Sequence, residues 1–246
     1  MKRIVLLLSV AVLATSSQAQ GLKNILKKDE SGKSGIDKIL KAPTKSALSN
    51  DEIVSGLKEA LSVGTNNASK QLSNVDGFFK DAAIKILMPA EAQKAEKKLR
   101  ALGMGKLVDD AILSMNRAAE DASKSAAPIF VNAVKQMSIG DAVGILKGGD
   151  FAATTYLKDK TTASLTESFR PVIDASLKKT DATKYWNAVF TAYNKFSADK
   201  INPDLAAYVT EKSLSGIFHQ VGLEEQKIRK DPVARTTDIL KKVFAN

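Results

Sequence analysis

Apolar residues recur every three or four positions along most of the chain after residue 49, which is the periodicity of amphipathic helices. The first helix is expected to begin at Ser49, a good N-cap residue, because Asp51 and Glu52 then fall in its first turn. The clearest periodic segment runs from Lys106 to Met137. Its many alanines predict a closely packed neighbour, and Pro128 predicts a kink within it.

Cap residues, prolines and glycines divide the rest of the chain into further helices, and Gly103 is interpreted as the C-cap of one of them. The expected segments are 74–87, 90–102 after Pro89, 139–147 with a Ser138–Asp141 capping box, one capped by Asp150, one that starts at Thr161 or Thr162 and contains Pro171, one that starts at Asp181, one opened by Asn202-Pro203, and a last one opened by Asp231-Pro232. No alternating strand pattern of useful length occurs in the sequence. The pattern therefore predicts a single all-α domain of about eight to ten helices.

The segment before this domain has a different composition. Lys2 and Arg3 precede an apolar run from Ile4 to Ala14, and Ala19 is a small residue of the kind that a signal peptidase requires. The run is shorter than the roughly 20 residues that span a bilayer. Residues 1–19 are therefore predicted to be a signal peptide, 20–48 a flexible leader rich in Lys, Ser and Gly, and 49–246 the helical domain.

The formal net charge of +10 is concentrated at the two ends of the chain. Residues 20–49 carry seven lysines against three acidic residues, and residues 227–246 carry six basic residues against two acidic ones. The region between them is charge-balanced, which argues against nucleic acid as a partner. The basic leader, residues 20–48, is the better candidate for a weak electrostatic contact with an anionic membrane surface.

An ordered series of short motifs runs along the domain. The motifs are Ile84-Lys85-Ile86-Leu87-Met88-Pro89, Leu102-Gly103-Met104-Gly105, Asn116-Arg117-Ala118-Ala119-Glu120, Ala127-Pro128-Ile129-Phe130, Met137-Ser138-Ile139-Gly140-Asp141-Ala142, Tyr193-Asn194, Asp204-Leu205, Tyr208-Val209-Thr210, Glu224-Glu225, Ile228-Arg229, Pro232, Arg235-Thr236-Thr237 and Val243-Phe244. This series resembles domain-of-unknown-function family 4197. The resemblance implies an exported helical protein, in the periplasm of a Gram-negative bacterium or outside the cell, and it implies no activity and no catalytic residues.

The inventory of reactive side chains excludes several kinds of site. The chain has no cysteine and one histidine, His219, so a zinc site of thiolates or imidazoles cannot be assembled, and no metal or cofactor is expected. His219 itself is expected to be an ordinary helix-surface or half-buried residue. The glycines around Met104 do not form a phosphate-binding loop, because Lys106 is followed by Leu107. No Gly-x-Ser-x-Gly motif occurs, and a catalytic Ser–Lys dyad is not excluded by the sequence.

Four charged residues are candidates for binding or catalysis. Arg117 has ion-pair spacing with Glu120 or Asp121 in the middle of the clearest helix, and a solvated face is the simpler interpretation. If a neighbouring helix covers Arg117, the guanidinium is expected to make a buried polar contact or to bind an anion. Asp141 is either a helix-dipole partner or an inward-facing acid. An enzyme using carboxylate and arginine chemistry requires these residues and Arg170 to meet in one cleft.

The aromatic side chains Tyr185, Trp186 and Tyr193 recur at helical spacing. Core packing is the simpler interpretation, and a ligand pocket between helices is the alternative. The leading hypothesis is a non-enzymatic exported protein that binds a partner protein or an apolar or amphipathic ligand, with no cofactor. The alternatives are a hydrolase-type enzyme acting in a cleft between helices and membrane-surface association through the basic leader. The oligomeric state is not predicted.

Overall fold

The computed structural model describes one compact unit of the chain. It comprises residues 49–180, 204–235 and 237–244, without the side chain of Glu91, together with Thr183, Trp186, Asn187, Thr191, Asn194, Lys195 and Lys200. The expected signal peptide and basic leader, the helix expected from Asp181, and the candidate residues Tyr185 and Tyr193 lie outside this set.

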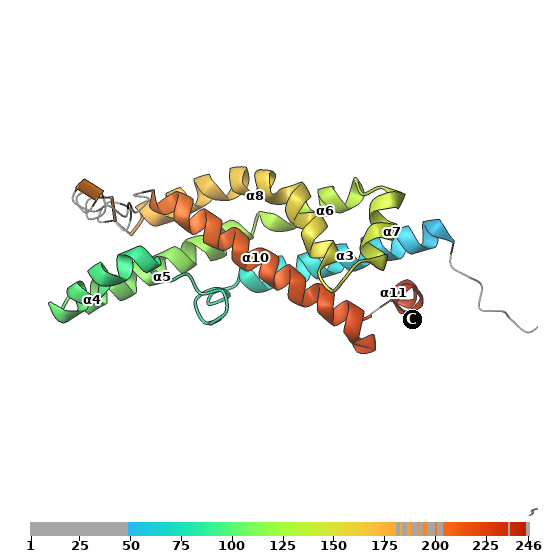
Figure 1. The fold of residues 1–246 in the computed structure, drawn as a ribbon, viewed down its shortest axis with the longest axis horizontal. Coiled ribbons are helices and arrows are strands. Elements are labelled where there is room, and N and C mark those ends of the chain that lie inside the picture. The colour runs from blue at the N-terminus through green and yellow to red at the C-terminus, as the bar shows by residue number, and fades with distance from the viewer. Residues whose placement is uncertain are drawn as a thin grey trace, which may run out of the picture. The chain divides into compact units, whose positions relative to one another are not determined.

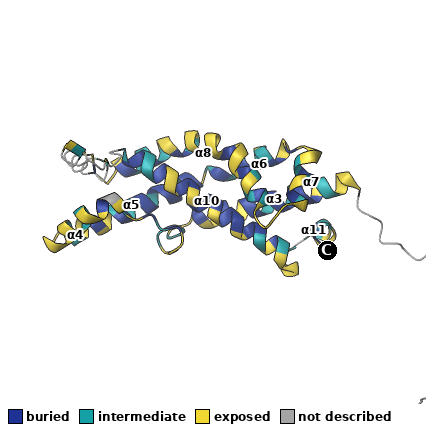
Figure 2. Cartoon of the chain, in the orientation of Figure 1, coloured by how far each residue is buried: buried dark blue, intermediate teal, exposed yellow. Residues whose placement is uncertain are grey.

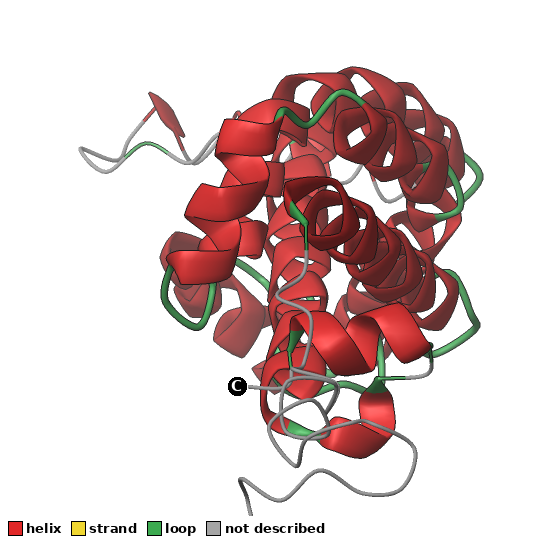
Figure 3. Ribbon diagram, turned by 90° about the vertical axis from the view of Figure 1, so that its right-hand side faces the viewer, coloured by secondary structure: helices red, strands yellow, loops and turns green. Residues whose placement is uncertain are grey.

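In the described part of the chain the fold is all-α, as predicted, and no strand occurs there (Figures 1 and 3). The elements are α3 (Asn50–Leu72), η1 (Ala90–Ala92), α4 (Gln93–Ala101), α5 (Gly105–Ser123), α6 (Ala126–Lys135), α7 (Ile139–Lys147), α8 (Ala152–Lys178), α10 (Leu205–Lys230), η2 (Pro232–Ala234) and α11 (Asp238–Val243). The η elements are single turns of 3₁₀ helix.

Helices α5, α8 and α10 pack against one another, and α3 packs against α10, α6, α7 and α11. Figure 2 shows that the long helices turn their buried faces toward one another and their exposed faces outward, whereas α4 has no buried residue. Ala118, Ala119 and Ala122 on α5 are completely buried, which confirms the closely packed neighbour that the alanines predicted. That neighbour is α8, because it makes the most extensive contact with α5. The small side chains allow the two helix backbones to approach each other.

The helix expected from Lys106 to Met137 is two helices, so the predicted kink at Pro128 is wrong. Helix α5 ends at Ser123 and α6 begins at Ala126. Proline has no N–H to donate to the carbonyl four residues earlier, and its ring clashes with that carbonyl, here that of Lys124. The chain therefore breaks one turn before the proline instead of bending at it.

The helix expected over residues 74–87 is also wrong, because this segment is a series of turns and an extended stretch. Asp76 has a left-handed backbone with φ 71°, which interrupts any helix. At Gly77 a Cβ atom would lie 2.5 Å from the carbonyl oxygen of Gln71, so only glycine fits this turn. We call residues 73–89 the connecting loop.

Helix α8 is continuous from Ala152, so the expected start at Thr161 or Thr162 is wrong. The Thr161 hydroxyl instead donates to the carbonyl oxygen of Leu157 at 2.6 Å, a bond made within a helix. The expected cap at Asp150 is also wrong: the N-cap of α8 is Phe151, and the Asp150 carboxylate forms an ion pair with Lys230 at 2.7 Å. Pro171 lies inside α8, as predicted.

Two other expected helix starts are wrong. The segment after Pro89 begins with the 3₁₀ turn η1, and α4 begins only at Gln93. Asp231-Pro232 opens the 3₁₀ turn η2, and the last helix, α11, begins at Asp238 after its N-cap Thr237.

The remaining boundaries agree with predicted caps. Ser49 caps α3, and the capping box of Ser138 and Asp141 opens α7 with the predicted bounds. Gly103 has φ 79°, the left-handed conformation of a helix C-cap. The N-cap of α10 is Asp204, and the Asn202-Pro203 pair that was expected to open this helix lies outside the described residues.

No single helix in the described part of the chain is long and apolar enough to cross a membrane; only α6 and α7 taken together reach that length and composition, and they are bent by 107°.

Candidate functional site

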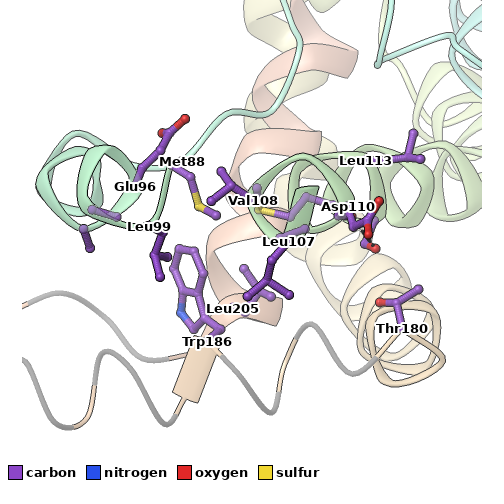
Figure 4. A pocket seen from close by; sticks show the side chains of 15 residues that line it. Met88, Glu96, Leu99, Leu107, Val108, Asp110, Leu113, Thr180, Trp186 and Leu205 are labelled. Atoms are coloured by element: carbon purple, nitrogen blue, oxygen red, sulfur yellow. Dashed lines mark hydrogen bonds between the residues drawn. The ribbon is translucent and has the colours of Figure 1, made fainter. Parts of the chain in front are cut away.

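A pocket of about 410 Å³ opens between α4, α5, the start of α10 and Trp186. We call it the apolar pocket. Most of its lining is apolar, and the residues that line it are Met88, Ala92, Ala95, Glu96, Leu99, Leu107, Val108, Asp110, Ala111, Leu113, Ser114, Met115, Thr180, Trp186 and Leu205. Figure 4 shows the side chains of Met88, Leu99, Val108 and Trp186 pointing toward one another from different segments.

The local sequence places α4 beside α5 and leaves space between them. The left-handed backbone of Gly103 reverses the chain between the two helices. The Arg100 guanidinium then bridges them, with ion pairs to Glu96 on α4 at 3.0 Å and to Asp109 on α5 at 2.8 Å. The facing alanines, among them Ala111, are too small to fill the gap. The pocket is therefore the space that small residues leave between two helices held at a fixed separation.

Trp186 forms one wall of the apolar pocket and is the only tryptophan in the chain. Its side chain is 6% exposed, and its indole stacks on the Tyr208 ring with the centroids 6.0 Å apart. The sequence left core packing and a pocket position open for Trp186, and the structure shows a residue of the buried core whose side chain also lines the pocket. Large amphipathic rings of this kind contribute contact area in ligand sites at a low entropic cost.

Glu120 anchors the connecting loop that leads into the pocket. Its carboxylate is almost fully buried, and Oε1 accepts hydrogen bonds from the backbone N–H of Phe78 at 3.1 Å and of Phe79 at 3.2 Å. Oε2 forms an ion pair with Arg117 at 2.6 Å, and Arg117 also reaches Asp76 at 2.7 Å. These contacts give the buried carboxylate a charged partner and leave neither oxygen unsatisfied.

Of the two partners that the spacing offered to Arg117, the structure pairs it with Glu120, while Asp121 pairs with Lys124, and a neighbouring segment does cover part of Arg117. That segment is the connecting loop, not a helix, and the Arg117 side chain is still 37% exposed. Its pKa is raised, first by the hydrogen bond to Glu120 and then by the one to Asp76. The pKa of Asp76 is lowered, first by Lys80 and then by Arg117. The group thus holds the loop, and its charges are already paired with each other.

Asn116 holds the extended part of the connecting loop. Its amide oxygen accepts from the backbone N–H of Ile86 at 2.9 Å, and its amide nitrogen donates to the Ile86 carbonyl at 2.8 Å. The completely buried amide thereby imitates a neighbouring strand and fixes the position of Met88 at the pocket wall. This role was not predicted from the sequence. The position of an asparagine beside the apolar stripe of α5 could have indicated a buried amide that binds backbone groups.

The other charged candidates lie apart from this group. Asp141 belongs to the exposed cap of α7, where hydrogen bonds from the hydroxyl and the backbone N–H of Ser138 lower its pKa. Arg170 on α8 forms an exposed ion pair with Asp204 at the start of α10. The structure therefore brings Arg117 and Glu120 together, and it does not bring Asp141 or Arg170 to them. The described residues include no group of three or more His, Asp or Glu side chains placed to hold a metal ion.

The fold and the pocket define the class of this protein: a single all-α domain with an apolar pocket between helices, in the part of the chain that the structure describes. The chain belongs to the family described as "Protein of unknown function (DUF4197)", which matches residues 47–245 and confirms the resemblance found in the sequence. Searches of curated proteins and of solved structures each found no match.

Proposed function

We propose that this protein binds an apolar or amphipathic small molecule in the apolar pocket and catalyses no reaction on it. The observation that carries the proposal is the pocket itself, about 410 Å³ in volume and lined mainly by aliphatic side chains and one tryptophan. Pockets for small molecules have volumes of about 300–1,000 Å³ and linings of this kind.

The polar groups around the pocket favour binding over hydrolysis. Glu96 takes part in an ion pair with Arg100, and Asp110 pairs with Lys106 at 2.8 Å, so both carboxylates already have cationic partners. Acid–base catalysis needs groups placed around one reacting atom, and the four charged candidates from the sequence do not meet there. An apolar tail that displaces water from the pocket is a better match to this lining.

Fluorescence of Trp186 tests the proposal, because this residue is the only tryptophan and lies in the pocket wall. Decanol serves as an uncharged probe with an apolar tail. Titration into the wild-type protein is expected to change the emission in a saturable way. Ala111→Phe places a ring in the cavity and should weaken binding by about tenfold or more, because an overfilled site costs about 1–3 kcal/mol.

Ala163→Phe is the matched control, since Ala163 is exposed on α8 and does not line the pocket. It should bind decanol as the wild type does. A wild-type titration without a saturable change, or equal affinities for the wild type and Ala111→Phe, would contradict the proposal.

We also propose that the protein is exported, on the pattern of Lys2, Arg3 and the apolar run that follows. The mass of the mature protein then corresponds to a chain that begins at Gln20. A mature chain that retains Met1 through Ala19 would contradict this.

A further inference from the structure

A second cavity, of about 330 Å³, lies between residues 83–87 of the connecting loop and α10. We call it the basic cleft, because its lining includes Lys85 from the loop and Lys212 from α10, with His219 of α10 beside them. The change from one lining to the other falls between consecutive residues of the loop: Leu87 lines the cleft and Met88 lines the pocket, and the two linings have no residue in common.

The stacked pair of aromatic rings marks the same boundary. Tyr208 lines the basic cleft, and Trp186, which stacks on it, lines the apolar pocket. The Tyr208 hydroxyl donates to the carbonyl oxygen of Leu87 at 2.8 Å, so the loop is attached to α10 at this point. Leu87 itself is 54% exposed, which leaves an apolar surface at the rim between the two cavities.

The lysines of the basic cleft lie over aromatic rings. The Nζ atom of Lys85 lies 4.0 Å from the centroid of the Phe79 ring, and within the described residues this amine has no carboxylate partner. Lys212 lies 5.6 Å from the Tyr208 centroid, and its acidic contact is the exposed Glu211 at 3.8 Å. Rings attract a cation without neutralising its charge, so both lysines remain available to an anion.

The lining residues of the basic cleft include no acidic side chain. In this the cleft differs from the apolar pocket, whose lining includes Glu96 and Asp110. Positive groups that surround a cavity without nearby acids attract anions. The cleft thus favours an anionic group, and the apolar pocket favours an uncharged one.

Gly216 allows the loop to approach α10 closely enough to form the cleft. A Cβ atom at this position would lie 2.5 Å from Cε1 of Phe78 and 3.4 Å from Cβ of Ile84. Because glycine has no Cβ, the loop packs directly on the helix and brings Lys85 toward Lys212. The contact between the loop and α10 is therefore part of the packed fold, and the exposed Lys212 and His219 side chains lie at the edge of this contact.

We infer that the basic cleft binds the anionic head, a carboxylate or a phosphate, of the amphiphile whose tail occupies the apolar pocket. This inference rests on the proposed function and adds the charge of the ligand to it. The head is held by Lys85 and Lys212, with His219 at the same cavity, and the chain of the ligand passes over Leu87 into the pocket.

Two residues that each occur once in the sequence report on the two cavities separately. Trp186 reports on the apolar pocket by fluorescence, and His219 reports on the basic cleft by the NMR signal of its ring. Decanoate and decanol serve as probes with the same tail and different heads. Both should change the Trp186 emission, and only decanoate should shift the His219 signal. Decanoate should bind about tenfold more tightly, which is the effect of one or two charge-assisted hydrogen bonds.

The double variant K85Q/K212Q removes both charges and keeps the length of the side chains. It should reduce the affinity for decanoate to that for decanol and leave the affinity for decanol unchanged. The matched control is K158Q/K160Q, two exposed lysines of α8, of which Lys160 also lies over a ring, that of Tyr156, at 5.8 Å. This control should bind both probes as the wild type does.

Equal affinities for the two probes in the wild type, or a preference for decanoate that survives in K85Q/K212Q, would overturn the inference while the proposed function stands. Inorganic phosphate is a third probe, tested by the NMR signal of His219. If it shifts the His219 signal and decanoate does not, the cleft serves a free anion and the inference is wrong. If neither probe changes the Trp186 emission, the proposed function itself fails.

Discussion

Two buried glutamates, Glu120 on α5 and Glu225 on α10, hold two regions of the domain by the same arrangement. Each accepts hydrogen bonds from two consecutive backbone N–H groups and forms an ion pair with one arginine, Arg117 or Arg229. The side chains of both glutamates are 5% exposed. Burial of a carboxylate is tolerated in both places because every oxygen has partners.

The two regions differ in how firmly the arginine is held. Arg229 is 14% exposed and also donates to the carbonyl oxygen of Ile145 at 2.9 Å, so it joins α10 to α7. Arg117 is 37% exposed, and its second partner is Asp76 on the connecting loop. The first arginine is therefore fixed between two helices, and the second is fixed partly by a loop that water reaches.

The two glutamates position different parts of the domain. Glu225 caps the N-terminus of α8 from another helix, with Oε1 3.0 Å from the Ala153 nitrogen and Oε2 2.8 Å from the Thr154 nitrogen. Glu120 instead fixes the connecting loop, which supplies Met88 to the apolar pocket and Lys85 to the basic cleft. One arrangement thus stabilises the helical architecture and the other supports the proposed site.

The largest loss of stability is expected for Glu225→Ala. This change leaves the first N–H groups of α8 without an acceptor and leaves Arg229 buried without its partner. Removal of one member of a buried ion pair costs about 3–5 kcal/mol of unfolding free energy. Urea denaturation measures this loss, and the decanol affinity of the folded fraction should stay at the wild-type value. A loss below about 1 kcal/mol, the value of an exposed pair, would contradict the comparison.

Glu120→Ala should lower the unfolding free energy less than Glu225→Ala does, and it should weaken ligand binding more. Both changes remove the acceptor of two backbone N–H groups, at about 1–3 kcal/mol for each group, so the difference lies in the arginine: Arg117 retains Asp76 and contact with water, and Arg229 is left buried without a carboxylate. Because the loop carries Met88, the affinity for decanol should fall by about tenfold or more. The comparison of the two regions is wrong if Glu225→Ala weakens decanol binding as much as Glu120→Ala does.

The smallest effect is expected for Asp76→Asn, and it should depend on pH. Asparagine tolerates the left-handed backbone of Asp76, so the substitution changes the charge and not the turn. The pKa of Asp76 is lowered by Lys80 and Arg117, so its contribution is present at neutral pH and is lost as the pH falls through the folded-state pKa. The wild type and the variant should therefore differ in stability at pH 7 and converge at acid pH, below the usual aspartate value of about 4.

The control for this pH dependence is Asp159→Asn, at an exposed aspartate of α8. It should leave stability unchanged at every pH. If the difference between the wild type and Asp76→Asn persists in acid, the charge of Asp76 is not its cause.

Local signals in the sequence predicted the parts of the fold that local interactions determine. The capping box of Ser138 and Asp141 gave the bounds of α7, because both partners lie within one turn. The cap of α8 could not be predicted in this way, since its acceptor, Glu225, lies more than 70 residues away in the chain. Asp150 was the local residue expected to cap this helix, but its carboxylate pairs with Lys230.

The same limit applies to the candidate site. Helical spacing is visible in the sequence, so it marked Trp186 as a core or pocket residue and offered Glu120 or Asp121 as the partner of Arg117, of which the structure has Glu120. The connecting loop was misread as a helix, because its N–H groups bond to Glu120 and Asn116 on α5, which periodicity does not reveal. Met88 was therefore not recognised as a pocket residue.

Mass spectrometry of the bound ligand tests the central claim most directly. Wild-type protein and Ala111→Phe are purified without detergent, their apolar contents are extracted, and the extracts are compared per mole of protein. We predict an amphiphile with an anionic head in the wild-type extract, in near-equimolar amount, and its loss from the Ala111→Phe extract. The same compounds in the same amounts in both extracts, or no such compound in the wild type, would contradict the claim that the apolar pocket is a ligand site.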